Sequence, residues 1–486
     1  MGILINSENT MRPFHPFILV SLLLTAGAFS CNKVSKNKAK PNIVFLFIDD
    51  LGWKDVGFMG SEYYETPAID QLAKNGMVFT QAYANAANCA PTRACLLSGQ
   101  YSPRHGVYTV ARPDRGDPKD RRLIPIPNSR TVPLEHVMIS EALKPAGYRS
   151  AAIGKWNVGN SPEKQGFDLG IPGSGFQGHF NEEGEYLTDY LTDQAVAFIK
   201  DNHPMDTGDP FFLYLAHYAV HTPIQAKDSL IDKYQEKQGS RYQNNPTYAA
   251  MIESVDQSVA KINATLEELG LTENTLLVFF SDNGGHGTYT SQKPLRGGKG
   301  MFYEGGIREP MFVYWPGQIK AGTVCEEPVI GTDFYPTFLE LAGVDQPTDY
   351  VLDGRSIVPL LKGEASLKRE AIFWHFPAYL NAYQGMKEES RDTVFRTRPV
   401  SIIRKGEWKL LQFHEEWVLD GGQEKLPDNN AVELYNLSSD LGETKNLAAV
   451  EIGKREELLD DLIKWQKDID APIPREMNPK YEDKIK

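Results

Sequence analysis

Cys89 and Arg93 are the residues whose types and spacing most clearly suit chemistry. They belong to the run C-A-P-T-R-A-C-L-L-S-G, which starts at Cys89. The proline of this run, Pro91, is typical of the first turn of a helix. Side chains four residues apart lie on one face of a helix, so the thiol and the guanidinium would share the helix start. A reactive sulfur beside a fixed positive charge predicts a site for an anion.

Most free cysteines in proteins are buried and inert, and this alternative best explains Cys95 and Cys325. A disulfide between Cys89 and Cys95 is a second alternative for the motif. Residues six apart on a helix are about 9 Å apart along its axis and point in different directions, which does not suit a disulfide. We therefore expect Cys89 to be free, with its partners supplied by other parts of the chain.

Acidic and amide side chains follow two predicted strands. The apolar run Asn42 to Ile48 is typical of a strand buried on both faces of a parallel sheet, and it ends at Asp49-Asp50. The run Thr275 to Ser281 ends in the same way at Asp282-Asn283. Ligands of open α/β sheets bind beyond the carboxyl ends of the strands, so we expect both pairs at one site.

The oxygen atoms of these four side chains are hard ligands that suit calcium or magnesium. The sequence has no accompanying cluster of histidine and cysteine that would indicate zinc. A solvated acidic loop would explain either pair by itself. Taken together, the two pairs predict a calcium site.

Basic side chains follow two further apolar runs. Arg149 to Gly154 leads directly to Lys155, and Pro210 to Ala216 leads within a few residues to His221. Lys299 lies between glycines in P-L-R-G-G-K-G-M-F-Y-E-G-G-I-R-E-P. Glycines let a backbone approach a ligand closely, and the lysine supplies a positive charge. We expect these three side chains to join the acidic pairs, although a glycine-rich surface loop is the alternative for Lys299.

The elements that must position these residues indicate an α/β fold. The strand at 275–281 follows a helix with one apolar face, which Gly270 ends. A helix followed by a buried strand is a crossover of a doubly wound sheet. We predict a large, mainly parallel mixed sheet with helices on both faces in a catalytic domain at 41–370.

The pattern changes at about Ala371, where we predict a C-terminal subdomain at 371–486. Ser401 to Gln412 reads as two short strands around a Lys-Gly-Glu turn, followed by V-E-L-Y-N-L and a final helix. This pattern predicts a small antiparallel sheet with a terminal helix. Aromatic and basic side chains in this part could contact a sugar, with core packing as the alternative for the tryptophans. These candidates are Trp374, His375, Arg404 and Trp408.

The N-terminal residues indicate export. Residues 1–31 combine basic residues with an apolar stretch that is too short for a permanent membrane span, as in a signal peptide. Cys31 follows Ala-Phe-Ser, a loose lipidation signal, whereas Ala26-Gly27-Ala28 suits ordinary cleavage. Residues 32–40 are a lysine-rich polar tether. We expect a periplasmic protein, or a lipoprotein of a Gram-negative bacterium that is held at the membrane only through Cys31.

The net charge of −13 and the isoelectric point near 5.4 argue against nucleic-acid binding, which requires a basic surface. The chain of 486 residues is long enough for one large α/β domain and a smaller one. Because few cysteines remain after Cys31, disulfides are not expected to stabilise the fold.

Together these segments resemble the formylglycine-dependent sulfatases, the type I arylsulfatase-like branch of the alkaline-phosphatase-like superfamily. The resemblance covers about Pro41 to Ala448 and rests on I-D-D-L-G-W, C-A-P-T-R, G-K-W, Y-A-V-H-T-P-I-Q-A, S-D-N-G-G, P-L-R-G-G-K-G and Y-E-G-G-I-R, in this order. It implies that a maturing enzyme oxidises Cys89 to formylglycine (3-oxoalanine). The W-H-F-P and R-K-G-E-W-K-L segments are similar to those of bacterial sulfatases that act on glycans, which implies a sulfated carbohydrate substrate.

The resemblance also implies a role for each residue. One calcium ion would be bound by Asp49, Asp50, Asp282, Asn283 and the modified Cys89. The hydrated formylglycine would attack sulfur, Arg93 and the calcium would neutralise the sulfonyl oxygens, and Lys155 and Lys299 would add positive charge. His221, helped by Lys299, would protonate the departing alcohol.

One position departs from the family pattern, which commonly has histidine where this chain has Asn157. Asparagine can hydrogen-bond to the formylglycine hydroxyl but cannot take its proton. A sugar-binding protein with an impaired site therefore remains an alternative. A phosphatase or phosphodiesterase of the same superfamily is another, although Cys89 and the few histidines do not suit a two-zinc site.

Overall fold

The structure is a computed structural model, and it describes residues 40–383 and 389–483. The predicted signal peptide, Cys31 and all of the predicted tether except Lys40 lie outside the described residues. Among the residues that are described, none of the helices combines the length and apolar character of a membrane span.

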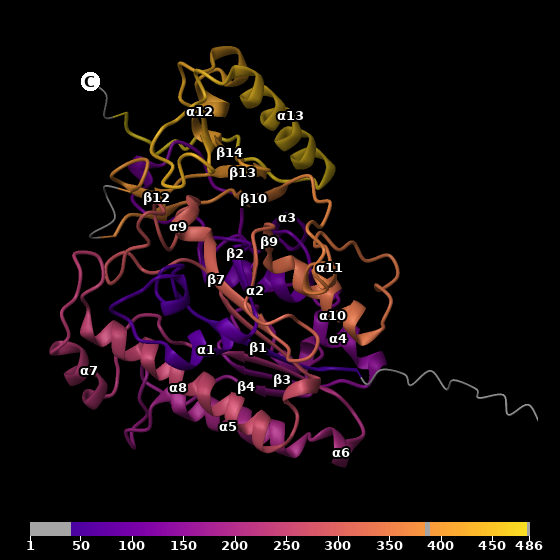
Figure 1. The fold of residues 1–486 in the computed structure, drawn as a ribbon. Coiled ribbons are helices and arrows are strands. Elements are labelled where there is room, and N and C mark those ends of the chain that lie inside the picture. The colour runs from indigo at the N-terminus through magenta and orange to yellow at the C-terminus, as the bar shows by residue number, and fades with distance from the viewer. Residues whose placement is uncertain (1–39, 384–388, 484–486) are drawn as a thin grey trace, which may run out of the picture. The chain divides into compact units, whose positions relative to one another are not determined.

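A nine-stranded mixed sheet forms the centre of the larger part of the fold (Figure 1). Its strands follow the order β4-β3-β5-β1-β6-β7-β2-β8, and β9 pairs with β2. The five strands from β4 to β6 are parallel, and β7 runs antiparallel to both of its neighbours. The predicted mainly parallel mixed sheet is therefore confirmed. The strands are β1 (Asn42–Ile48), β2 (Met77–Tyr83), β3 (Arg149–Gly154), β4 (Leu169–Ile171), β5 (Phe211–Ala216), β6 (Thr275–Ser281), β7 (Arg308–Tyr314), β8 (Thr323–Cys325) and β9 (Val329–Ile330).

Helices cover both faces of this sheet because its central strands are apolar on both faces. Every residue of β1 and of β6 is buried. Phe45 and Phe47 face one core cluster, whereas Val44 and Leu46 face the other. The first cluster includes residues of α2 (Cys89–Ser98), α4 (Ile139–Leu143) and α10 (Phe334–Ala342). The second includes residues of α1 (Pro67–Asn75), α5 (Leu187–Asp201), α7 (Asp228–Gln235) and α8 (Pro246–Glu268).

The local sequence explains where the crossover helix α8 begins and ends. The Asn245 side chain accepts a hydrogen bond from the backbone N–H of Tyr248, and Pro246 occupies the first helical position. Gly270 follows the helix with a φ of +66°, a conformation that favours glycine. The chain then enters β6, as the apolar pattern predicts.

A separate four-stranded antiparallel sheet follows the large sheet in sequence, in the order β10-β13-β14-β15. Its strands are β10 (Ile372–Phe376), β13 (Val400–Lys405), β14 (Trp408–Phe413) and β15 (Val432–Asn436), and α13 (Ile452–Asp468) packs against β13 and β14. The predicted turn is confirmed, because Lys405 pairs with Trp408 across it. A third core cluster joins this sheet to α13.

Shorter elements complete the described part of the chain. β11 (Leu380–Asn381) and β12 (Phe395–Thr397) form a two-stranded sheet. The remaining short helices are α3 (Ser102–His105), α6 (Pro204–Thr207), α9 (Glu304–Ile307), α11 (Val358–Leu361) and α12 (His414–Leu419).

Candidate active site

The two acidic pairs lie side by side because β1 and β6 are parallel neighbours that end at the same level. Ile48 pairs with Ser281, the last residues of the two strands. The backbone N–H of Asp50 donates to Asp282 Oδ1 over 3.2 Å, and the Asn283 amide donates to Asp50 Oδ1 over 2.8 Å. The side chains of these residues are buried. The predicted convergence of both pairs at one edge of the sheet is confirmed.

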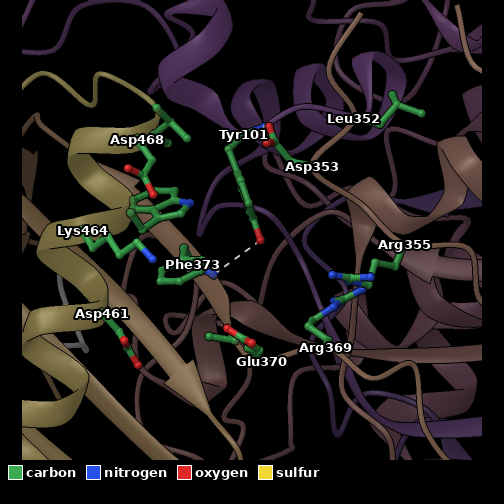
Figure 2. A pocket seen from close by; sticks show the side chains of 13 residues that line it. Tyr101, Leu352, Asp353, Arg355, Arg369, Glu370, Phe373, Asp461, Lys464 and Asp468 are labelled. Carbon is green, nitrogen blue, oxygen red and sulfur yellow. Dashed lines mark hydrogen bonds between the residues drawn. The ribbon is translucent and has the colours of Figure 1, made fainter.

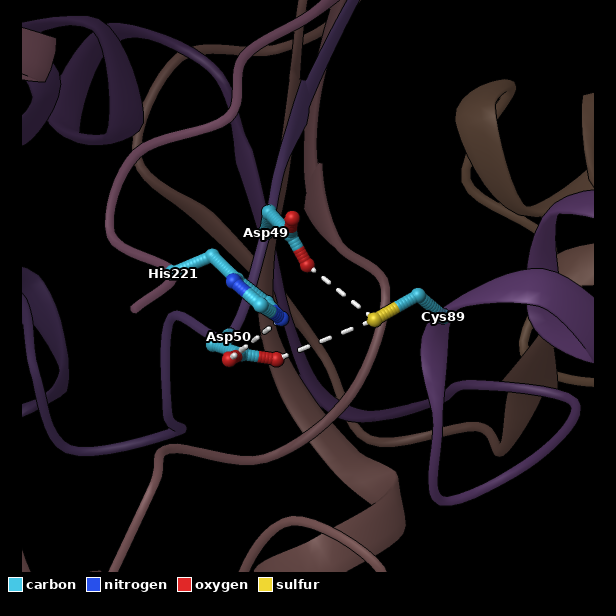
Figure 3. Close-up of side chains that lie close together, drawn as sticks. All are labelled: Asp49, Asp50, Cys89 and His221. Atoms are coloured by element: carbon cyan, nitrogen blue, oxygen red, sulfur yellow. Dashed lines mark hydrogen bonds and ion pairs between the residues drawn. The ribbon is translucent and has the colours of Figure 1, made fainter. Parts of the chain in front are cut away.

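Cys89 is the first residue of α2, two residues before the proline that indicates the helix. Its side chain is 2% exposed, and its Sγ lies 3.3 Å from Asp49 Oδ1 and 4.0 Å from Asp50 Oδ1 (Figure 3). Cys89 and Cys95 are both free in the structure, as expected. The helix start thus holds the sulfur against the carboxylates.

Each of three buried carboxylates has a cation. Lys155, which follows β3, donates to Asp49 Oδ2 and lies with its Nζ 3.5 Å from Cys89 Sγ. Lys299 Nζ donates to Asp50 Oδ2 over 2.6 Å. The guanidinium of Arg93 donates to Asp282 Oδ2 over 3.0 and 2.6 Å and is completely buried. The predicted basic residues therefore belong to the same site as the acidic ones.

Burial and neighbouring charges act against each other at these groups. Burial would raise the pKa of Asp49, but the positive charges of Lys155 and other neighbours outweigh it and hold this pKa well below its usual value. Burial and the charge of Asp49 raise the pKa of Asp282 to about 7. Burial, reinforced by Asp282 and Asp49, also raises the pKa of the Cys89 thiol. The unmodified thiol is therefore protonated at neutral pH and is a weak nucleophile.

The residues present could hold a metal ion, and the carboxylate and amide oxygens among them suit a hard one. Ligand atoms of Asp49, Asp50, Cys89 and His221 all lie within 4.8 Å of one another. Asn283 Oδ1 is buried and has no hydrogen-bond partner among the described residues. A buried acceptor without a partner, next to several carboxylates, is the arrangement that a bound cation would complete.

His221 lies in the loop after β5 with one ring nitrogen directed toward the cluster. Its Nδ1 lies 2.6 Å from Thr222 O, which can only accept, so Nδ1 carries a hydrogen. Nε2 is then available for proton exchange, and it lies 3.9 Å from Asp50 Oδ2 (Figure 3). The neighbouring His179 donates through Nε2 to His221 O over 2.9 Å and holds this loop.

Two of the predicted substrate contacts are core residues in the structure. Trp374 is 1% exposed, donates to Ala84 O and packs against Tyr83. His375 is buried between Ser401 Oγ and Pro472 O, which occupy both of its ring nitrogens. Their burial corrects the interpretation that they contact substrate, because neither presents a free polar atom to a ligand.

The other substrate candidates also lack a contact with the cluster. Arg404 is buried, lies over the ring of Tyr83 and donates to Gln81. Trp408 is half-buried and packs against the core of the small sheet. Asn157 is exposed with a φ of +56°, and its side chain has no hydrogen-bond partner among the described residues.

Sequence reasoning missed three side chains near Lys299, and one further arginine. Tyr383 Oη donates to Lys299 O over 3.0 Å, and His286 stacks on the Tyr383 ring at 4.1 Å. Arg396 Nη1 also donates to Lys299 O, over 3.3 Å. The further arginine is Arg115, whose pKa is lowered by burial and then by the positive charge of Arg396. The only sequence signal was for His286, which directly follows S-D-N-G-G.

A cavity of about 380 Å³ lies elsewhere, where α13 meets the larger part of the fold (Figure 2). Tyr101, Phe373 and Trp465 line it together with Arg355 and Arg369. Tyr101 follows the carboxyl end of α2, whereas Cys89 is at its start. The helix is about 15 Å long and separates the two residues. The cavity contains none of the clustered residues, so it is separate from the candidate active site.

Comparison with known proteins identifies the family. The sulfatase family model matches residues 41–344, which is more than half of the chain, and the model of the N-sulphoglucosamine sulphohydrolase C-terminal region matches residues 297–464. A sulfatase of Formosa agariphila is 32% identical over 90% of each chain. The N-acetylgalactosamine-6-sulfatase of Mus musculus is 35% identical over 67% of each chain.

Solved structures agree with this result. The crystal structure of Ps i-CgsB in complex with k-i-k-neocarrahexaose is similar with a TM-score of 0.72 and 30% identity, over 90% of this chain and 95% of that one. The fold is therefore that of the alkaline-phosphatase-like sulfatases, as the sequence motifs imply. The chain belongs to the sulfatase family and is a sulfuric ester hydrolase.

Proposed function

We propose that this protein is an exported sulfatase that removes sulfate from a carbohydrate, with a formylglycine derived from Cys89 and one bound calcium ion. The observation that carries the proposal is the position of Cys89. Its buried sulfur lies at a helix start, within 4.0 Å of two carboxylates and 3.5 Å from Lys155 Nζ. A buried, protonated thiol would remain a weak nucleophile in these surroundings. A modified side chain at the same position could instead react with an anionic substrate.

Asp49, Asp50, Asp282 and Asn283 would hold the calcium together with the modified Cys89. When bound, the ion supplies positive charge that stabilises the sulfonyl oxygens. Arg93 holds the Asp282 carboxylate through two hydrogen bonds and adds positive charge to the site. The buried, unpartnered Asn283 Oδ1 supports this assignment.

The remaining charged side chains act on the substrate. Lys155 and Lys299 would bind the sulfonyl oxygens as negative charge develops there. His221 would give the proton on Nε2 to the departing alcohol, because its Nδ1 proton is held by Thr222 O. Asn157 would hydrogen-bond at most, since an amide cannot accept the proton that a histidine takes.

The carbohydrate substrate is supported by the relatives. One is an N-acetylgalactosamine-6-sulfatase, and the structure of Ps i-CgsB contains k-i-k-neocarrahexaose. Export is supported by the signal-peptide pattern of residues 1–31. A maturing enzyme in the same host would be required, and the protein would act in the periplasm or as a lipoprotein anchored through Cys31.

Mass spectrometry of the peptide that contains Cys89, from protein isolated from its native host, tests this proposal. We expect the aldehyde mass at Cys89, one calcium per chain, and sulfate release from a sulfated sugar. An unmodified thiol without sulfate release would favour a sugar-binding protein. Two zinc ions per chain would favour the phosphatase alternative.

A further inference from the structure

Arg396 is a buried cation without a carboxylate partner. It lies in β12 and is 9% exposed. Its Nε donates to Asn381 O over 2.9 Å, its Nη1 to Lys299 O over 3.3 Å, and its guanidinium lies 4.3 Å from the centre of the Tyr383 ring. No acidic side chain of residues 40–383 or 389–483 forms an ion pair with it. Carbonyl oxygens and a ring thus hold Arg396 in place and leave its charge uncompensated.

Lys299 joins Arg396 to the active site. The Lys299 carbonyl accepts hydrogen bonds from Arg396 and from Tyr383 Oη. The side chain of the same residue donates through Nζ to Asp50 Oδ2 over 2.6 Å. Lys299 therefore connects the Arg396 guanidinium to Asp50, one of the carboxylates beside Cys89.

Arg115 belongs to a different segment, which contacts the strand of Arg396. Gly116, its neighbour, has a φ of +84°, and a Cβ at this position would lie 2.7 Å from the ring of Phe395. The segment that carries Arg115 therefore contacts the strand that carries Arg396. At the other end of the segment, Thr109 Oγ1 accepts from the Asn88 amide over 3.0 Å. The segment thus contacts both the residue before Cys89 and the strand of Arg396.

The positive charges of Arg115 and Arg396 are not balanced by an acidic side chain that forms an ion pair with either of them among the described residues. Arg115 is half-buried, and among the described residues its guanidinium donates only to Val110 O. Burial lowers the pKa of Arg115, and the charge of Arg396 lowers it further. Two partly buried cations of like charge are unfavourable near each other unless an anion lies between them.

We propose that Arg115 and Arg396 form an anion subsite beside Cys89, which binds a second negatively charged group of the substrate. The inference rests on the proposed function, in which Lys155 and Lys299 bind the sulfate that is removed. Guanidinium groups bind carboxylates and sulfate-like groups through paired hydrogen bonds. The substrate class is therefore a sugar that carries a further sulfate or a uronate carboxylate next to the scissile sulfate.

Inhibition of 4-nitrophenyl sulfate hydrolysis tests the subsite, because this reporter has a single anionic group. The inhibitors are N-acetylgalactosamine 6-sulfate, its 4,6-disulfate, and a glucuronyl disaccharide of the 6-sulfate. The last two distinguish a second sulfate from a carboxylate. The variants are Arg115→Gln, Arg396→Gln and Arg396→Lys. Arg112→Gln is the matched control, since Arg112 lies in the same segment with its side chain 65% exposed and paired with Asp114.

We expect at least one doubly anionic sugar to inhibit the native enzyme about tenfold more strongly than the 6-sulfate. Each Arg→Gln variant should lose this difference, Arg396→Lys should keep part of it, and Arg112→Gln should keep all of it. The kcat/KM for 4-nitrophenyl sulfate should change by less than about twofold in Arg112→Gln. For each Arg115 or Arg396 variant, the inhibition by the doubly anionic sugars is compared with the inhibition of the same variant by the 6-sulfate, so that a change in basal activity does not affect the comparison. Melting temperatures identify any variant that fails to fold.

Equal inhibition of the native enzyme by all three sugars would overturn the subsite. Loss of 4-nitrophenyl sulfate hydrolysis in both Arg→Gln variants would also overturn it, because the arginines would then act on the scissile group. If the native protein carries formylglycine and releases no sulfate, the proposed function fails. Calorimetric binding of the same three sugars then still tests the subsite.

Discussion

Lys155 lies with its Nζ 3.5 Å from Cys89 Sγ while it donates to the carboxylate of Asp49. Burial would lower the pKa of Lys155, but the negative charge of Asp49 outweighs it and raises this pKa, so the ammonium keeps its charge. A fixed positive charge thus stands next to the proposed nucleophile before any substrate arrives.

Replacement of this lysine should therefore reduce the chemical step. We expect Lys155→Met to lower kcat by about 10² to 10³, the loss typical of one group that stabilises charge in a transition state. KM should change much less. Steady-state kinetics with a sulfated substrate measure both constants, and Lys200→Met, at the exposed end of α5, is the control. A loss confined to KM would show that Lys155 binds the ground state instead.

Removal of the proposed calcium ion should destabilise the protein as well as inactivate it. Three carboxylates and Asn283 Oδ1 are buried together, and a bound cation would offset their repulsion. A ligand present at a hundred times its dissociation constant adds about 2.7 kcal/mol to the free energy of unfolding. We expect a chelator to lower the melting temperature and calcium to restore it. A melting temperature that is indifferent to both additions would contradict the metal assignment.

Asn157→His should raise the steady-state rate of sulfate release if proton removal at this position limits turnover. Histidine tolerates the φ of +56° better than most residues, so the exchange is compatible with the backbone. Comparison of the initial burst with the steady-state rate locates the affected step. Asn157→Ala separates proton transfer from a change of size, because an equal gain in both variants would exclude a role as a base. An unchanged or lower rate in Asn157→His would show that asparagine suits this site.

A buried lysine between two glutamates predicts a specific pH dependence of stability. Lys409 Nζ lies 3.0 Å from Glu304 and 2.9 Å from Glu443, and all three side chains are completely buried. Burial raises the pKa of Glu443 from 4.5 to about 7, with Glu304 adding to this effect and Lys409 opposing it. The folded protein therefore binds this proton more tightly than the unfolded chain. The associated stability is complete below about pH 4.5 and is lost as the pH rises through about 7.

Urea unfolding at pH 5 and pH 8 measures this effect. Wild-type protein should lose up to about 3 kcal/mol more than Glu443→Gln over this interval, because the variant has no proton to release. Glu424→Gln, at an exposed position, should behave as wild type. Parallel pH dependence of wild type and Glu443→Gln would show that Glu443 is ionised throughout.

The sequence by itself determined the strands that build the site. β1, β3 and β6 have the predicted bounds because each has an apolar stretch that ends just before polar residues. Since parallel strands end at one edge of a sheet, the residues after them had to meet there. The motif around Cys89 likewise predicted a helix start, which α2 confirms.

Only the tertiary structure decided which other residues belong to the site. Trp374 and His375 are residue types that suit a sugar-binding surface, but packing of the small sheet buries them. Arg115 and Arg396 belong to no motif and lie 281 positions apart in the printed sequence. Their two segments touch where Gly116 lies against the ring of Phe395, and a contact between distant segments has no signal in local composition or periodicity.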